Sequence, residues 1–235
     1  MKTLIIIPAY NEAENIERVI NNLISNYPAY DYVVVNDGST DDTLSICLSH
    51  RYNMLDLPIN LGIGGAVQAG YRYALANDYD IAVQMDGDGQ HDPTFLDEMV
   101  KCIESGEADL VVGSRFVTKE GFQSSGARRT GIKFLSGLGH MLTGVRLKDI
   151  TSGFRMVNRK LIEIYADDYP ADYPEPEAMV IASVYGCRLK EYPVIMKERL
   201  GGVSSITLRK SVYYMFKVSL AMIIRRVSIG FRRKR

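Results

Sequence analysis

The most chemically suggestive part of the sequence is an acidic segment at residues 86–91, which reads Asp-Gly-Asp-Gly-Gln-His. Two carboxylates, Asp86 and Asp88, flank one glycine directly after a hydrophobic run. Residues two apart in an extended chain lie on the same side, so both carboxylates can meet one hard divalent cation. A cation held there would neutralise a diphosphate and stabilise it as a leaving group. The simpler alternative is a polar turn that only caps the following helix, with Asp92 as the cap.

Two further polar segments follow strand-like runs earlier in the chain. Residues 36–43 read Asn-Asp-Gly-Ser-Thr-Asp-Asp-Thr. In this segment Asp37 could accept a hydrogen bond from a base or a ribose, and Ser39 or Thr40 could cap the next helix. Residues 60–66 read Asn-Leu-Gly-Ile-Gly-Gly-Ala, a glycine-rich loop that opens a helix. Such a loop is a weak phosphate signal, its spacing matches neither a Walker loop nor a dinucleotide fingerprint, and its glycines could serve close packing alone.

These segments need a scaffold that brings them together, and the hydrophobic pattern predicts one. Short apolar runs alternate with amphipathic stretches along the first half of the chain, which indicates βαβ units and a mostly parallel α/β sheet flanked by helices. Ligands bind outside the carboxyl ends of the strands in such sheets. The expected strands are residues 4–7, 32–35, 54–57, 81–85, 110–112 and 188–196. The expected helices are residues 12–26, 41–51, 64–76, 93–105, 132–143, 161–165 and 177–185, with a loop expected at 121–129.

The C-terminal segment differs from the rest of the chain in charge. Residues 199–235 contain ten Lys and Arg and no Asp or Glu, which leaves 18 basic and 28 acidic residues elsewhere although the net charge is zero. We therefore expect a catalytic domain at 1–208 and a basic amphipathic helix at 209–235. That helix would lie on an anionic membrane surface, dock on a small membrane protein or form a homo-oligomer. A terminal helix that packs on the body is the simpler alternative. Apolar residues recur at helical spacing along it: Val212, Phe216, Leu220, Ile223, Val227 and Phe231.

The composition argues against several classes of protein. Cys47, Cys102 and Cys187 are far apart and fit neither a zinc site nor a disulfide framework, which favours a reducing compartment. The N-terminal apolar run is too short for a signal peptide, and no run is long enough for a transmembrane helix. The acidic body argues against a nucleic-acid partner. The expected location is cytoplasmic, peripheral on the inner face of the cell membrane.

The order of these motifs resembles glycosyltransferase family 2, and within it the polyprenyl-phosphate sugar synthases of the dolichyl-phosphate mannose synthase branch. The resemblance begins with residues 5–12 (Ile-Ile-Ile-Pro-Ala-Tyr-Asn-Glu) and includes the three segments above. It extends through residues 113–116 (Gly-Ser-Arg-Phe), 151–155 (Thr-Ser-Gly-Phe-Arg) and 199–206 (Arg-Leu-Gly-Gly-Val-Ser-Ser-Ile). It implies a GT-A fold and the transfer of a sugar from a nucleotide donor.

The resemblance also implies roles for single residues. Asp86, Asp88 and Gln90 would hold Mg²⁺ or Mn²⁺, and Asp37 would meet the base of the nucleotide. Arg115 would act in catalysis together with Asp88. For each arginine, a solvated surface ion pair is the simpler interpretation. The residues implied to bind the nucleotide sugar are Pro8, Tyr10, Glu12, Asp37, Gly62, Gly64, Asp86, Arg128, Arg129, Arg199 and Ser205.

The acceptor is the least constrained part of the prediction. An inverting enzyme with a hydroxyl acceptor needs a carboxylate base, and Glu175 and Glu177 stand where the family often carries one. The adjacent Glu-Asp pair usual at that place is absent, and both glutamates would also suit a helix N-terminus. A phosphate acceptor is already ionised and needs no base. We therefore expect a catalytic transfer of a hexose or N-acetylhexosamine from a UDP-sugar to undecaprenyl phosphate for cell-envelope polysaccharide synthesis, with GDP- or dTDP-sugars as alternative donors.

Two other functions remain open from the sequence. The first is a glycosyltransferase that extends a cell-surface polysaccharide at a sugar hydroxyl, with Glu177 or Glu175 as the catalytic base. The second is a non-catalytic subunit that binds a nucleotide sugar, against which the intact acidic segment at 86–91 argues.

Overall fold

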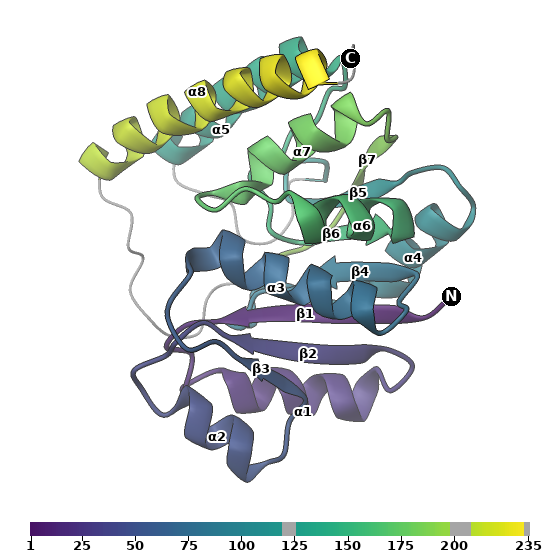
Figure 1. The fold of residues 1–235 in the computed structure, drawn as a ribbon, viewed down its shortest axis with the longest axis vertical. Coiled ribbons are helices and arrows are strands. Elements are labelled where there is room, and N and C mark those ends of the chain that lie inside the picture. The colour runs from purple at the N-terminus through teal and green to yellow at the C-terminus, as the bar shows by residue number, and fades with distance from the viewer. Residues whose placement is uncertain (119–125, 198–207, 233–235) are drawn as a thin grey trace.

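A computed structural model describes residues 1–118, 126–197 and 208–232, and its elements alternate between strands and helices over most of the chain. The strands are β1 (Thr3–Ala9), β2 (Asp31–Asn36), β3 (Met54–Asp56), β4 (Ile81–Gln84), β5 (Leu110–Ser114), β6 (Arg155–Asn158) and β7 (Leu189–Pro193). The helices are α1 (Ile16–Asn26), α2 (Thr43–Ser49), α3 (Gly62–Ala76), α4 (Leu96–Glu104), α5 (Gly126–Thr143), α6 (Arg159–Asp167), α7 (Pro174–Val184) and α8 (Leu208–Arg232), with a 3₁₀ turn at Pro93–Phe95. Helices cover both faces of one central sheet (Figure 1), which confirms the expected fold class.

The sheet has seven strands in the order β3-β2-β1-β4-β6-β5-β7. The pairs that exclude β6 are parallel, whereas β6 runs antiparallel between β4 and β5. Strand order reverses around β1, so the carboxyl ends of β1, β2 and β4 meet at a topological switch point, where such sheets bind ligands. Sequence reasoning missed β6, because residues 151–155 were considered only as a motif.

The position of β1 in the sheet explains its uninterrupted apolar run. Leu4 and Ile6 pack on the face covered by α3 and α6, and Ile5 and Ile7 pack on the face covered by α1 and α4. Successive side chains of a strand point to opposite faces, so a strand covered on both sides needs an apolar residue at every position. The polar segment after β1 therefore begins where the strand leaves the hydrophobic cores on the two faces of the sheet.

The helix caps after β2 differ from the expectation. The N-cap of α2 is Asp42, not Ser39 or Thr40. The Ser39 hydroxyl instead accepts from the Asn11 backbone N–H at 3.0 Å, and the Thr40 N–H donates to the Asn11 side-chain oxygen at 2.8 Å. These contacts tie the loop after β1 to the loop after β2. The capping prediction was wrong because a partner distant in the sequence competed for the same groups.

The loop expected at residues 121–129 is wrong from Gly126 onward, where α5 begins. A side chain at Gly131 would lie 3.1 Å from the sulfur of Met215 in α8, so this glycine permits a close approach of the two helices. Packing against α8 outweighs the weak helix propensity of this glycine-rich sequence. Helix α7 begins at Pro174, earlier than expected, because proline is well tolerated in the first turn of a helix.

Helix α8 is apolar on two opposite faces. Val218, Met222 and Ile229 are buried in the core shared with α3, α6 and α7. The described members of the stripe seen in the sequence lie on the other face, where Phe216 is 71% exposed. Helix α8 lies alongside α5 and α7 (Figure 1), so this C-terminal helix packs on the body of the protein. Among the α8 side chains that the structure describes, those at 214–229, the exposed large apolar ones are Phe216, Leu220, Ile223, Ile224 and Val227.

Candidate active site

The carboxyl ends of β1, β2 and β4 enclose a cavity of about 390 Å³. Parallel pairing of β1 with both neighbours places their terminal loops side by side. The N-terminus of α3 closes the opposite wall, with Gly62 among the lining residues. The structure therefore brings together most of the donor-binding residues expected from the sequence. Those that line the cavity are Pro8, Tyr10, Glu12, Asp37, Gly62, Asp86 and Asp88.

The acidic segment after β4 is held as a tight turn. The Asp88 carboxylate accepts from the Gln90 backbone N–H at 3.0 Å, and Gly89 adopts φ +78°. The Gln90 side-chain nitrogen donates to the Lys197 carbonyl at 3.3 Å. Asp92 accepts from the Thr94 N–H at 3.1 Å, so its expected capping role is confirmed. The turn presents two carboxylates to one cavity and also caps the next helix, so the two interpretations of this segment do not exclude each other.

The residues of this turn fit a hard divalent cation, since carboxylate and amide oxygens are the ligands that Mg²⁺ and Mn²⁺ prefer. Asp86 is partly exposed to the cavity and Asp88 is buried in its wall. Across the part of the chain that the structure describes, no three His, Cys, Asp or Glu side chains form a metal-binding group. A cation at Asp86 and Asp88 would therefore complete its coordination with other oxygens, such as the amide of Gln90 and a diphosphate.

Asp37, at the end of β2, is buried in the cavity wall. One carboxylate oxygen accepts from the Leu61 backbone N–H at 2.7 Å, which holds the glycine-rich loop against β2. Burial raises the pKa of Asp37 above its ordinary value, and the backbone donors of Leu61 and Gly62 oppose that shift. Asp37 thus shapes the pocket as well as lining it.

Gly64 lies one turn into α3, behind the cavity wall. Its N–H donates to the Ala171 carbonyl at 3.1 Å. A side chain at Gly64 would lie 2.0 Å from the Pro170 carbonyl oxygen and 2.3 Å from that of Ala171. This glycine permits backbone-to-backbone packing, which was the alternative interpretation of the loop, and it acts on the pocket through the position of α3.

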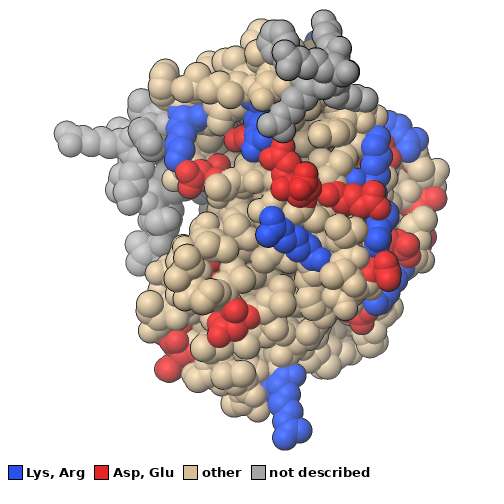
Figure 2. Space-filling view, in the orientation of Figure 1, with Lys and Arg blue, Asp and Glu red and all other residues tan. Residues whose placement is uncertain are grey.

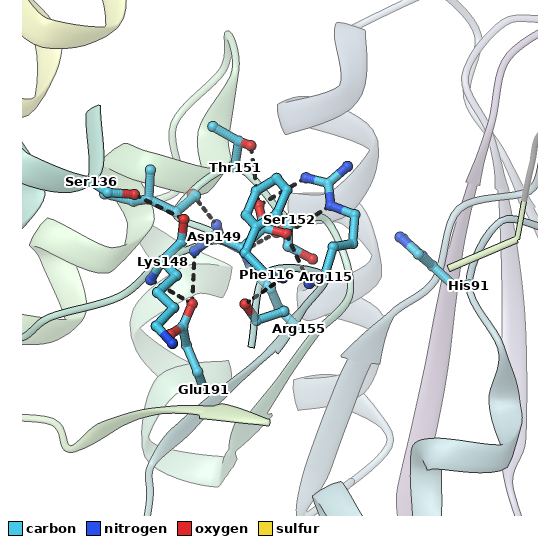
Figure 3. Close-up of polar contacts among 12 residues, drawn as sticks. His91, Arg115, Phe116, Ser136, Lys148, Asp149, Thr151, Ser152, Arg155 and Glu191 are labelled. Carbon is cyan, nitrogen blue, oxygen red and sulfur yellow. Dashed lines mark hydrogen bonds and ion pairs between the residues drawn. The ribbon is translucent and has the colours of Figure 1, made fainter. Parts of the chain in front are cut away.

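Arg115, directly after β5, is buried in a two-pronged ion pair (Figure 3). Its guanidinium donates to both oxygens of the fully buried Asp149, at 2.7 and 2.8 Å. The backbone N–H groups of Lys148 and Asp149 donate to Glu191 at 2.6 and 2.7 Å. Sequence reasoning missed Asp149 and Glu191; the only available signal was that a buried arginine requires a counter-ion.

Arg115 and Arg129 meet at one aromatic ring. The Arg115 guanidinium lies 5.3 Å from the Phe116 ring centre, and that of Arg129 lies 5.9 Å from it. Arg128 belongs to α5, but its side chain is outside the described part of the structure. Arg199 and Ser205 also lie outside the described residues. Two of the arginines to which the resemblance gives roles therefore lie at the ring of Phe116.

The segment at residues 149–155 connects Arg115 to the acidic turn. Asp149 holds Arg115, and a side chain at Gly153 would lie 3.3 Å from both carboxylate oxygens of Asp86. Four residues of chain span at most about 14 Å, so the two regions are close neighbours. Buried Arg155 fixes the segment by donating to the carbonyls of Ser152 and Ile150, at 2.6 and 2.7 Å, and to that of Glu175.

The two candidate bases face different surroundings. The Glu177 carboxylate pairs with Arg225 of α8 at 2.5 Å, so it ties that helix to α7. Burial raises the pKa of Glu175, the charge of Arg155 opposes this, and the charge of Asp86 raises the pKa further. Glu175 therefore lies within the field of the acidic turn, whereas Glu177 is committed to a structural ion pair. Because Glu177 is held in this ion pair, Glu175 is the more available of the two wherever a base is required.

A second cavity of about 690 Å³ opens beside Phe116, along one face of α5. Its wall combines apolar side chains with cations at the rim. Gly137 leaves space in it, because a side chain there would meet nothing within 4 Å. The lining residues are Phe116, Arg129, Ile132, Lys133, Ser136, Gly137, His140, Arg146, Leu147 and Lys148.

Comparisons with known proteins agree with this geometry. Residues 4–165 match the model of glycosyl transferase family 2. The chain is 31% identical to the polyprenol monophosphomannose synthase of Mycolicibacterium smegmatis, over 93% of this chain and 86% of that protein. It is 30% identical to the UDP-N-acetylglucosamine–dolichyl-phosphate N-acetylglucosaminyltransferase of Methanococcus voltae, over 81% of this chain and 83% of that protein.

The fold of the chain is also similar to that of a solved enzyme. The glucosyl-3-phosphoglycerate synthase of Mycobacterium tuberculosis, solved with Mn²⁺, uridine diphosphate and phosphoglyceric acid, superposes with a TM-score of 0.70 at 20% identity, over 96% of this chain and 78% of that one. The likeness at this identity concerns the fold, a GT-A glycosyltransferase fold. The chain therefore belongs to glycosyl transferase family 2 and is a glycosyltransferase.

Proposed function

We propose that this glycosyltransferase moves a hexose or N-acetylhexosamine from a UDP-sugar to polyprenyl phosphate, with undecaprenyl phosphate as the acceptor. The observation that carries this proposal is the second cavity, which joins an apolar wall to a basic rim beside Phe116, the residue that follows Arg115. A phosphate on an apolar chain matches both parts of such a wall. The two relatives named above carry polyprenol and dolichyl phosphate in their names, which supports the same acceptor class.

The donor would occupy the cavity at the ends of β1, β2 and β4. Asp37 and the loop it holds would meet the nucleoside, and Asp86, Asp88 and Gln90 would hold Mg²⁺ or Mn²⁺. When bound, the cation supplies charge neutralisation of the departing diphosphate. The pocket itself orients the donor, since its walls are fixed by the hydrogen bonds of Asp37 and Asp88. The sugars named for the two relatives differ, so the pocket could serve either class of sugar.

The acceptor would lie along α5 with its phosphate toward Arg115 and Arg129. An ionised phosphate attacks without a base, so Glu177 is free to hold Arg225. Lys133 and Lys148 at the rim would balance the charge of the phosphate. Asp149 fixes the orientation of the Arg115 guanidinium in advance, which suits a contact with the acceptor phosphate.

The outer faces of α5 and α8 would rest on the membrane that carries this lipid. Phe134 and Met141, seven residues apart on α5, are exposed on one face, and Met141 is 72% exposed. They add to the exposed apolar stripe of the neighbouring α8. Charged side chains of both signs mix on the face drawn in Figure 2. The exposed side chains of the α8 stripe, by contrast, are apolar. Within residues 1–118, 126–197 and 208–232, no helix is long and apolar enough to cross a membrane.

The alternative enzymatic function is transfer to a sugar hydroxyl of a cell-surface polysaccharide. The observation that favours it is the position of Glu175, whose pKa is raised by burial and by Asp86, as suits a general base. Glu175→Gln separates the two functions. Transfer to polyprenyl phosphate should persist within about threefold, whereas transfer to a hydroxyl should fall by about 10²- to 10⁴-fold.

The direct test is a donor screen with undecaprenyl phosphate as acceptor. Purified protein with Mg²⁺ or Mn²⁺ is incubated with UDP-glucose, UDP-N-acetylglucosamine or GDP-mannose, and the lipid product is followed by mass spectrometry. A sugar-linked undecaprenyl phosphate supports the proposal. Turnover of a donor onto oligosaccharide but not onto the lipid would favour the alternative. Tight donor binding without turnover onto either acceptor would favour a non-catalytic subunit.

Gly137→Leu tests the acceptor cavity separately. The new side chain enters open space in the cavity, and leucine suits a helix better than glycine. The KM for polyprenyl phosphate should rise about 10-fold, while the affinity for the nucleotide and the melting temperature should not fall. Gly137→Ala is the matched control with a small side chain. An unchanged KM in the leucine variant would place the acceptor elsewhere.

The membrane surface needs a test that spares the core. Truncation before α8 would remove Val218 and Met222 from the core, so substitution of the outer face is preferable. The combined variant Phe216→Gln, Leu220→Gln, Val227→Gln should sediment much less with anionic vesicles than the unmodified protein does. The control is Leu48→Gln with Ile59→Gln, exposed apolar residues outside α5 and α8. Equal sedimentation of both variants would contradict the proposal that the outer face of α8 binds the membrane.

A further inference from the structure

His91, the last residue of the acidic segment, directs both ring nitrogens at Asp86. Its Nδ1 accepts from the Asp86 backbone N–H at 3.0 Å. Its Nε2 lies 3.7 Å from Oδ2 of the Asp86 carboxylate. A neutral imidazole has one donor and one acceptor nitrogen. Because Nδ1 accepts, the ring carries its proton on Nε2, the nitrogen that faces the carboxylate.

The ring has little freedom to turn away from Asp86. It is only 5% exposed and stacks on Phe154, with ring centres 5.0 Å apart and an interplanar angle of 14°. Figure 3 shows His91 on its own side of the site, apart from the Arg115–Asp149 pair. The histidine is therefore not part of the acceptor-side ion pairs, and its polar contacts act on the acidic turn.

The Asp86 carboxylate is also approached from two other directions. The side-chain nitrogen of buried Gln84 lies 3.4 Å from its Oδ1. Gly153 leaves room for the carboxylate, since a side chain there would lie 3.3 Å from both of its oxygens. His91 and Gln84 thus present N–H groups to different oxygens of one carboxylate. Such an arrangement fixes the plane of the carboxylate before any cation arrives.

We propose that His91 is a positioning residue for the cation and diphosphate site: its Nε2–H orients Oδ2 of Asp86, and its Nδ1 fixes the backbone from which that carboxylate projects. This inference rests on the proposed metal site at Asp86 and Asp88. At 3.7 Å the Nε2 contact is longer than a direct hydrogen bond, so it acts as an electrostatic restraint on the rotamer of Asp86. Loss of an outer partner of a metal ligand typically weakens metal affinity by about 10- to 100-fold.

Two amide substitutions separate positioning from packing. An asparagine at position 91 can place an acceptor oxygen near the site of Nδ1 but has no donor near that of Nε2. A glutamine can place a donor nitrogen near the site of Nε2. Both remove the ring that stacks on Phe154, so a role in packing alone would make the two variants behave alike.

The experiment is Mn²⁺ binding in the presence of UDP, followed by the electron paramagnetic resonance signal of free Mn²⁺, with melting temperature as a second readout. His91→Asn should weaken Mn²⁺ affinity about 10- to 100-fold, and His91→Gln, which keeps a donor near the Nε2 site but loses the acceptor at the Nδ1 site, should weaken it clearly less. His50→Asn is the control, because His50 is exposed and distant from the acidic turn in the sequence. The KM for the nucleotide sugar should rise more in the asparagine variant than in the glutamine variant.

Three results would overturn the proposal, and they are distinguishable. Unchanged Mn²⁺ affinity in His91→Asn would show that the histidine does not position Asp86. Equal losses of affinity and melting temperature in both variants would show a packing role. Asp86→Asn identifies the remaining case: if this variant binds Mn²⁺ as well as the unmodified protein does, the metal site itself is misplaced and the proposed function fails at that point.

Discussion

Asp37, Asp86 and Asp88 follow β2 and β4, which pair in parallel with the two sides of β1, whereas Arg115 and Glu177 are oriented by ion pairs with residues far away in the sequence. The proposed donor side thus takes its geometry from the sheet. The proposed acceptor side takes it from pairs that join β5 to the segment after α5, and α7 to α8. A polar residue directly after a strand can be predicted from the sequence to lie in the first kind of site. The sequence around a charged residue does not identify the residue with which it forms an ion pair.

The two sides also differ in the substitutions that they tolerate without a loss of stability. The carboxylates of Asp37, Asp86 and Asp88 line a cavity, and an amide of the same size can replace each of them. Arg115 and Asp149 are buried together, so removal of one leaves the other without its counter-ion. We therefore expect donor-side changes to affect mainly activity and acceptor-side changes to affect both activity and stability.

The largest effect is expected from Asp88→Asn. Loss of one of two carboxylates facing the diphosphate should lower kcat/KM by about 10³-fold, with little change in melting temperature. Steady-state kinetics with saturating Mn²⁺ measure the effect, and Asp42→Asn, an exposed carboxylate, is the control. A large loss of stability in Asp88→Asn would remove the contrast between the two sides.

The second effect is expected from Asp149→Asn. Breaking a buried ion pair costs about 3–5 kcal/mol in the free energy of unfolding, which urea denaturation measures. The activity should fall as well, because Arg115 loses the partner that orients it. The double variant Arg115→Met, Asp149→Leu should regain stability but not activity. Recovery of activity in the double variant would show that Arg115 does not contact the acceptor.

Gly64→Ala should produce a smaller effect, because Gly64 lies where α3 packs against the segment before α7. Its side chain would meet the Pro170 and Ala171 carbonyls, so the N-terminus of α3 must shift away from the segment before α7. Strain of this kind costs about 1–3 kcal/mol, and the KM for the donor should rise about 10-fold. The control is Gly137→Ala, a helix position with open space. An unchanged KM would show that the position of α3 is not critical for the donor.

The smallest effect is expected from the pH dependence of stability through Asp109. Burial alone would raise the pKa of Asp109, but hydrogen bonds from Arg188 and from Asn158 outweigh it and hold the pKa below its ordinary value of 3.8. A lowered pKa in the folded state gives stability that is present above 3.8 and lost as the pH falls through the folded value. Asp109→Asn should therefore flatten the decline of melting temperature in acid. Equal slopes in Asp109→Asn and the unmodified protein would contradict the shift.

The sequence by itself determined the scaffold and which polar segments meet at the cavity. The apolar run at Leu4–Ile7 indicated a strand, and the polar segments after β1, β2 and β4 indicated a site at their carboxyl ends. This worked because side chains alternate along a strand with a period of two, and because the carboxyl ends of parallel strands lie at the same edge of a sheet. The order of the motifs also indicated the family.

Only the tertiary structure decided the rest. It placed antiparallel β6 in the middle of the sheet, extended α5 into the expected loop, and gave Arg115 and Glu177 their partners, Asp149 and Arg225. It also showed that α8 carries one apolar face for the core and another for the surface. These features arise from contacts between segments far apart in the chain. Such contacts leave no local period or spacing in the sequence, because any residue of suitable size or charge could have supplied them from elsewhere.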